Sequence, residues 1–154
     1  MRVFFDTEFI DDGRRIHPIS IGLVREDGAE YYAEFDDCPV WLAGDWVKKN
    51  VLAKLTGESV PRDKIKANIV EFSGEDPEFW AYFADYDWVL MCQLFGTMME
   101  LPEGWPKFCM DLKQRLYEHG DPSVQRPESD DHHALADARW VAKTWRMYEK
   151  ARFL

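Results

Sequence analysis

RVFFDTEF, residues 2–9, is the stretch that decides the fold. Its β-branched and aromatic residues predict a strand. Asp6 and Glu8 are two residues apart, so both side chains leave the same face of that strand. Two carboxylates on one face repel each other, and one pKa rises, unless a cation lies between them. A solvated edge strand would account for an isolated Asp-x-Glu pair, but a first and central strand favours a functional site.

The segments that follow predict an antiparallel meander and then alternating helices and strands. Strands at 17–25 and 29–35 flank an Asp-Gly turn at 27–28. Apolar spacing and turn residues predict the later elements. They are helices at 45–55 with Asp45 as N-cap, 61–72, 87–95 and 132–150, strands at 78–84 and 107–111, a helix ending near Gly120, and a polar loop at 121–131. This order indicates an α/β domain with a mixed sheet, and no linker divides residues 1–154.

The composition limits the function classes. Hydrophobic residues make up 46% of the 154 residues, which predicts a packed globule. The net charge of −10, from 19 Lys and Arg against 29 Asp and Glu, argues against a protein that coats nucleic acid. An enzyme that holds one strand end through metal ions and a few cations remains compatible with it. Three scattered cysteines, no apolar run of membrane length and no signal pattern favour a cytoplasmic protein without membrane contact.

A further acidic residue, Asp87, lies in ADYDWVLMC beside an apolar helix. It could cap a helix at 88–95, which is a common use of aspartate, or it could be a metal ligand. Asp85 competes with it for either role, and spacing does not separate the two.

The fourth candidate carboxylate, Asp137, lies in DDHHALADARW within the most strongly amphipathic helix. It could be an exposed acid paired with Arg139 or Lys143, and His133 could pair with it along the helix. His132 is five residues earlier and falls in the loop or first turn, where it is free to reach a substrate. One divalent-metal site for phosphoryl chemistry explains all four carboxylates and a histidine together.

Three segments resemble the motifs of the DEDD exonuclease superfamily in its DEDDh branch. They are FDTEF at 5–9, DYDWVLMCQLFG at 85–96, and HHALADA at 132–138, which fits H-x-A-x-x-D-A. The chain is similar, more closely, to the mycobacterial-type 3′–5′ exoribonucleases related to RNase T. The resemblance implies a ribonuclease-H-like sheet, three antiparallel strands followed by parallel strands, flanked by helices. It selects Asp87 over Asp85 and His132 over His133.

The resemblance also implies a mechanism. It is a two-metal hydrolysis with Mg²⁺ or Mn²⁺, in which Asp6, Glu8, Asp87 and Asp137 hold the ions and His132 is the general base. Thr7 and Phe9 are implied as substrate contacts, although Phe9 could equally belong to the core. The candidate phosphate contacts are Arg14, Arg15, Lys107, Arg126 and Arg139.

The implied activity is release of nucleoside 5′-monophosphates from the 3′ ends of single-stranded RNA or overhangs, by a homodimer. Two alternatives stay open. The same fold could act on DNA ends as a 3′–5′ exodeoxyribonuclease, or it could be a catalytically silent module that binds nucleic acid.

Overall fold

The computed structural model describes residues 1–120 and 132–151, so the polar loop expected at 121–131 and Arg126 lie outside the described residues. Within these ranges the chain forms one mixed sheet of six strands. They are β1 (Arg2–Asp11), β2 (Ile16–Arg25), β3 (Glu30–Phe35), β4 (Ser59–Val60), β5 (Glu78–Ala81) and β6 (Met110–Asp111). The strand order is β4-β3-β2-β1-β5-β6. The antiparallel β1–β2–β3 meander and the parallel β1–β5 pair confirm the predicted mixed sheet.

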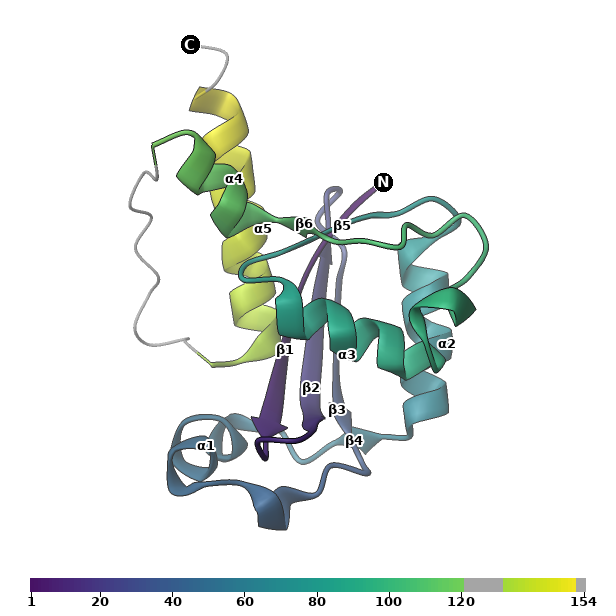
Figure 1. The fold of residues 1–154 in the computed structure, drawn as a ribbon, viewed down its shortest axis with the longest axis vertical. Coiled ribbons are helices and arrows are strands. Elements are labelled where there is room, and N and C mark those ends of the chain that lie inside the picture. The colour runs from purple at the N-terminus through teal and green to yellow at the C-terminus, as the bar shows by residue number, and fades with distance from the viewer. Residues whose placement is uncertain (121–131, 152–154) are drawn as a thin grey trace.

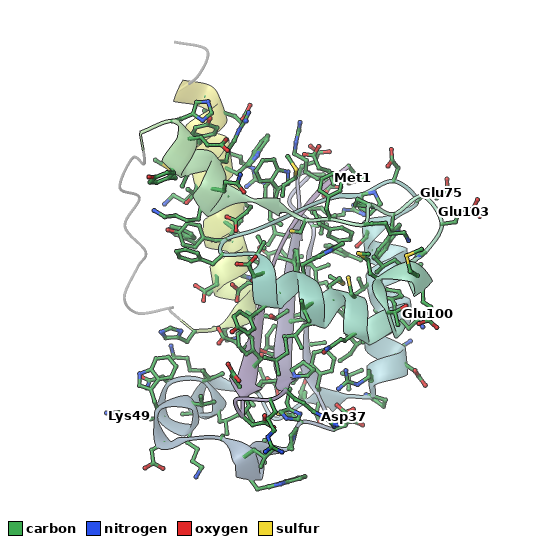
Figure 2. The ribbon with its side chains drawn as sticks, viewed as in Figure 1. Met1, Asp37, Lys49, Glu75, Glu100 and Glu103 are labelled. Carbon is green, nitrogen blue, oxygen red and sulfur yellow. The ribbon has the colours of Figure 1, made fainter. Side chains whose placement is uncertain are left out.

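Helices cover both faces of this sheet, as Figure 1 shows. In the described residues they are α1 (Asp45–Asn50), α2 (Arg62–Ser73), α3 (Asp85–Phe95), α4 (Leu112–Glu118) and α5 (Ala134–Ala151), with 3₁₀ turns η1 (Val40–Leu42), η2 (Leu52–Lys54) and η3 (Met98–Glu100). One core cluster joins the sheet to α2 and α3, and a second joins the opposite face to α4 and α5. Helix α1 lies beyond the end of the strands (Figure 1). It carries Lys49, whereas Met1, Glu75 and Glu103 lie at the opposite end of the molecule (Figure 2).

Strand β1 lies between β2 and β5, which makes it an interior strand as predicted. Val3 and Phe5 are fully buried in the core on the α2–α3 side, and Phe4 is fully buried on the α5 side. Because side chains alternate along a strand, Asp6 continues on the α5 side and Thr7 on the α3 side. The core therefore sets which helix each polar residue of β1 faces.

A β-bulge follows the two acidic residues of β1. Glu8 pairs with Ser20 and Phe9 with Pro18, so Ile19 is an extra residue in β2. Bulges bend a strand, increase its local twist and tolerate proline, which cannot donate to the ladder. The bulge thus changes the direction of the sheet between Glu8 and Phe9, and β1 continues paired with β2 as far as Asp11.

The first turn of α5 packs directly on the backbone of β2 at Gly22. Gly22 is the cross-strand partner of Asp6. A Cβ atom at Gly22 would lie 2.4 Å from the Cα and N atoms of Leu135, closer than packed atoms can approach. The missing side chain at Gly22 therefore lets α5 begin beside Asp6.

The helix predicted at 45–55 is wrong in its length and in its N-cap residue. Helix α1 ends at Asn50, and Gly44 rather than Asp45 is its N-cap residue. Val51 packs in a small cluster with Ile10, and Val47 packs against that cluster, whereas Trp46 is 56% exposed. Residues one step apart on a helix differ by roughly 100° in direction. The i, i+4 pair Val47 and Val51 takes the inward face and turns Trp46 outward.

The strand predicted at 78–84 is shorter than expected. Strand β5 ends at Ala81, and Phe83 has a φ of +58°, in the left-handed region that a strand cannot contain. The strand predicted at 107–111 contains only Met110 and Asp111.

Among the described residues, no helix is both long and apolar enough to cross a membrane. The three cysteines are free thiols.

The contact at Gly22 can be tested with Gly22→Ala. We expect the free energy of unfolding to fall by about 1–3 kcal/mol, because the new methyl group overpacks the contact with Leu135. Thermal unfolding followed by circular dichroism measures the change. Gly44→Ala is the control, since Gly44 has a φ of −68° and open space at its Cβ position, and it should lose only the smaller amount that alanine costs at an N-cap. Equal melting temperatures for the two variants would contradict the role given to Gly22.

Candidate metal and catalytic site

Three of the four predicted carboxylates meet at one end of the sheet. Asp6 and Glu8 come from β1 and Asp137 from the first turn of α5, and one oxygen from each lies within 4.8 Å of the other two. The three residues are only 8%, 9% and 4% exposed. Carboxylate oxygens held this close together are a donor set that suits a hard divalent cation.

Asp87 approaches the same cleft from the other face of the sheet. Its Oδ1 atom accepts hydrogen bonds from the backbone N–H of Thr7 at 2.9 Å and from the Thr7 hydroxyl at 2.5 Å. Asp87 is 5% exposed and lies outside the three-carboxylate group, but it lines the same cleft of about 350 Å³. The Thr7 hydroxyl, predicted as a substrate contact, donates to Asp87 and so orients that carboxylate.

The structure distinguishes the two roles left open for Asp87, helix cap or metal ligand, and it also distinguishes Asp87 from Asp85. Helix α3 begins at Asp85 with Ala84 as its N-cap residue, so the interpretation of Asp87 as a helix cap is wrong. Asp85 is exposed and lines a neighbouring groove, whereas Asp87 lines the cleft. Periodicity could not distinguish them, because both lie in the same first turn of α3.

The two histidines before α5 also lie in different places. His132 lines the cleft, and its backbone N–H donates to Asp137 Oδ2 at 3.2 Å. Its φ of +65° is in the left-handed region, which turns the chain sharply ahead of α5. The His133 ring instead stacks on Tyr32, with centroids 4.7 Å apart. The structure therefore brings His132, and not His133, to the carboxylates.

Asp137 is not the exposed helical acid that the simplest explanation required. The side chain of Arg139 binds Glu30 through two hydrogen bonds of 2.8 and 2.6 Å. Asp137 points instead toward β1, within reach of Asp6 and Glu8. The interpretation of Asp137 as a surface partner of Arg139 is therefore wrong.

A buried carboxylate in this protein is not necessarily part of the metal site, and Glu34 is an example. Glu34 is 2% exposed, yet its carboxylate accepts hydrogen bonds from the backbone N–H groups of Thr56 and Gly57 and from two hydroxyls. One of these hydroxyls belongs to Tyr32, whose pKa is raised by burial and by the carboxylates of Glu34 and Glu8. The phenol stays protonated and can donate. Glu34 is thus a structural carboxylate that holds the loop after η2.

Aromatic residues that the sequence analysis did not assign to the site also line the cleft. The Trp46 ring meets the His132 ring edge-on, with centroids 4.7 Å apart. Tyr86 stacks on Phe9 at 5.3 Å with an interplanar angle of 18°, so Phe9 is neither wholly core nor wholly exposed. The position of Trp46, one step from the Val47–Val51 face, was the signal that could have predicted its exposure.

Phe83, like His132, is a cleft residue whose φ is in the left-handed region. A bulky residue at a φ of +58° is strained by about 1–3 kcal/mol, and such strain is found at functional sites. The backbone N–H of the next residue, Ala84, donates to Asp111 Oδ2 at 2.9 Å, which fixes the turn. The Phe83 side chain is 60% exposed on the cleft wall. The turn thus holds an apolar ring on the cleft wall rather than in the core.

Solved structures of exonuclease I share this fold. The zinc-bound complex of Escherichia coli exonuclease I with single-stranded DNA aligns with a TM-score of 0.66 at 13% identity, over 97% of this chain and 40% of that one. An apo structure of exonuclease I gives a TM-score of 0.64, also at 13% identity, over 97% and 42% of the two chains. The chain therefore spans less than half of exonuclease I, and the likeness establishes a ribonuclease-H-like fold.

Sequence comparison reaches further. The 3′–5′ exoribonuclease Rv2179c of Mycobacterium tuberculosis strain H37Rv, and its counterpart MT2234.1 in strain CDC 1551, are 41% identical to this chain over 155 residues. The alignment covers 96% of this chain and 92% of each relative. The model of the "3′-5′ exoribonuclease Rv2179c-like domain" matches residues 1–148. The chain belongs to the family of Rv2179c-like 3′–5′ exoribonuclease domains.

Proposed function

We propose that this protein hydrolyses single-stranded RNA, or the 3′ overhang of a duplex, from the 3′ end and releases nucleoside 5′-monophosphates. The observation that carries the proposal is the convergence of Asp6, Glu8 and Asp137 within 4.8 Å in a cleft that Asp87 and His132 also line. Family membership supports the direction of hydrolysis and the RNA substrate. The whole chain, residues 1–154, would act as one exonuclease domain.

The carboxylates would hold two divalent cations, Mg²⁺ or Mn²⁺. Asp6, Glu8 and Asp137 would hold these ions together with Asp87, which lines the same cleft. The all-oxygen donor set supports this assignment, because hard cations prefer carboxylates and water. The chemistry that such cations supply is a lower pKa for the attacking water and stabilisation of charge on the leaving 3′ oxygen.

His132 would be the general base. Its backbone N–H is bonded to Asp137, so the residue that removes the proton is tied to a residue of the carboxylate cluster. The Trp46 ring lies edge-on against the imidazole and limits its movement. A base must be held within hydrogen-bond reach of the water it deprotonates, and these two contacts restrict the position of the imidazole.

The exposed rings around the cleft would hold the terminal bases. Phe83 and the Phe9–Tyr86 stack provide apolar faces on the cleft wall. Stacking of a base on an aromatic ring contributes about 1–3 kcal/mol and tolerates any base. Thr7 would act on the substrate indirectly, because its hydroxyl donates to Asp87 and orients that carboxylate. Thr7 also lines the cleft, where it could contact the substrate directly.

The activity can be tested with 5′-labelled single-stranded RNA and DNA of the same sequence. We expect stepwise shortening of RNA from its 3′ end with Mg²⁺, and no reaction with a chelator. Asp137→Asn should lower the rate by about a hundredfold or more, because it removes several kcal/mol of charge stabilisation. The control is Asp63→Asn, which removes the same charge from an exposed position on α2.

The outcomes of this assay also separate the two alternatives. Faster shortening of DNA than of RNA would favour an exodeoxyribonuclease. Binding of RNA without metal-stimulated hydrolysis would favour a silent binding module. A thermal scan adds a readout without substrate: a cation at about a hundred times its Kd stabilises the folded chain by ~2.7 kcal/mol. That stabilisation should shrink in Asp137→Asn, and a wild-type melting temperature indifferent to metal would count against the cluster as a metal site.

The assignment of the base can be tested by comparing His132→Ala with His133→Ala. Loss of a positioned general base lowers the rate by about 10²–10⁴-fold, and we expect that loss for His132. His133→Ala serves as the matched control, because it removes the adjacent ring, which stacks on Tyr32 outside the cleft lining. Single-turnover rates at saturating Mg²⁺ measure the effect. Equal losses, or a larger loss for His133→Ala, would overturn the assignment.

We also propose that the protein is a homodimer in a reducing cytoplasm. Turn η1 presents three consecutive exposed apolar residues, Val40, Trp41 and Leu42, and contiguous apolar surface favours a protein contact. Three unpaired thiols are compatible with a reducing compartment. Sedimentation equilibrium should give the mass of two chains for the wild type and of one chain for Trp41→Ser. Met99→Ser, at another exposed apolar residue, is the control. A monomeric wild type would refute the dimer.

A further inference from the structure

We propose that a second groove beside the cleft binds the phosphodiesters upstream of the 3′-terminal nucleotide, through Arg14 and Arg15. This inference rests on the proposed function, because it supposes a nucleic-acid strand whose 3′ end lies at the carboxylates. The groove has a volume of about 750 Å³ and lies between the β1–β2 turn and α3. Tyr86 lines both the groove and the cleft, so the two hollows share one wall.

The two arginines are available to an anionic ligand. Both are exposed at the β1–β2 turn, and within residues 1–120 and 132–151 neither guanidinium makes a hydrogen bond or an ion pair. Elsewhere the arginines are largely occupied: Arg2, Arg25, Arg62 and Arg139 each bind a carboxylate. In a chain with a net charge of −10, two adjacent arginines left without a carboxylate partner point to a ligand from outside the chain.

The turn that carries these arginines is held by Asp12. One oxygen of Asp12 accepts the backbone N–H groups of Arg14 and Arg15, both at 2.8 Å, and the other lies 2.9 Å from Nε2 of His17. Contact with His17 and these backbone hydrogen bonds lower the pKa of Asp12 to about 2, so the carboxylate stays ionised. Because its oxygens are occupied in this way, Asp12 fixes the backbone beneath the two guanidinium groups without binding either of them.

The charged side chains that line the groove differ from those that line the cleft, because only the groove contains arginines. The cleft wall carries four carboxylates, which repel phosphate unless cations are bound. The groove carries Arg14 and Arg15 against Asp11 and Asp85, and Asp11 Oδ1 already accepts the N–H of Gly13. A strand that leaves the cleft over the half-exposed Tyr86 ring therefore meets its first unpaired cations at these arginines. Guanidinium groups bind phosphate in bidentate fashion, which suits successive phosphodiesters.

The test compares a short and a long RNA on the double variant Arg14→Ala/Arg15→Ala. A dinucleotide occupies only the cleft, whereas a dodecanucleotide also extends into the groove. We expect kcat/KM for the dodecanucleotide to fall at least about tenfold further than kcat/KM for the dinucleotide, as two charged contacts are lost. The salt dependence of binding, as the slope of log K against log salt, should fall by about 1.4 for two phosphates on a single strand.

The matched control is Lys64→Ala/Lys143→Ala, which makes the same change in net charge at exposed positions on α2 and α5. It should leave the ratio of the two kcat/KM values unchanged. Arg14→Lys/Arg15→Lys should restore part of the lost binding, and Asp85→Asn should tighten it. Melting temperatures of all variants verify the fold. Equal losses on both substrates, or no loss on either, would overturn the proposal.

Binding measurements keep the groove testable apart from catalysis. Fluorescence anisotropy of a 5′-labelled dodecanucleotide, with Ca²⁺ in place of Mg²⁺, reports affinity without requiring turnover. If the wild type hydrolyses neither substrate, the proposed function fails, but weaker binding by the arginine variant would still support the groove. If hydrolysis proceeds and the arginine variant binds as tightly as the wild type, the groove assignment fails while the function stands.

Discussion

The site depends on one steric constraint: the first turn of α5 must lie against the backbone of β2. Gly22 makes this contact possible, since a Cβ there would come within 2.4 Å of Leu135 backbone atoms. Gly22 is also the cross-strand partner of Asp6, so the helix begins directly above the strand pair that carries the first carboxylate. Asp137 and Asp6 come from opposite ends of the chain, and this contact brings them together. A larger residue at position 22 would separate the helix from the sheet and the carboxylates from each other.

Strand β1 distributes the rest of the site between the two faces of the sheet. Its even-numbered residues Asp6 and Glu8 meet Asp137 on the α5 side. Thr7, between them, turns toward α3 and holds Asp87 through its backbone and its hydroxyl. Alternation along a single strand therefore organises carboxylates that arrive from two helices on opposite faces. Because the surrounding residues Val3, Phe4 and Phe5 are fully buried, this strand cannot shift its register without exposing the core.

Much of this arrangement could be predicted from the sequence, because regular elements leave periodic signals. The alternation of β1 indicated that Asp6 and Glu8 share a face, and the amphipathic pattern located α5. The irregular parts left no such signal. Asp85 and Asp87 lie in the same turn of α3, so periodicity could not choose between them, and the contact that fixes Asp87 comes from Thr7, which is remote in sequence. Phe83 and His132 both have φ values in the left-handed region, which a non-glycine residue rarely signals in advance.

The charge distribution resolves an apparent conflict between a chain of net charge −10 and a polyanionic substrate. Net charge governs long-range attraction, which salt screens within about 10 Å, whereas binding at a strand end depends on local groups. Here the arginines outside the groove are largely bound to carboxylates, and the acidic cluster is confined to one cleft. Cations bound at that cluster would neutralise its local negative charge, so affinity for the terminal phosphate would be conditional on metal. Away from the cluster, an acidic surface repels the phosphates of duplex or internal RNA. In the proposed function, the protein's acidic surface would therefore contribute to selectivity for strand ends.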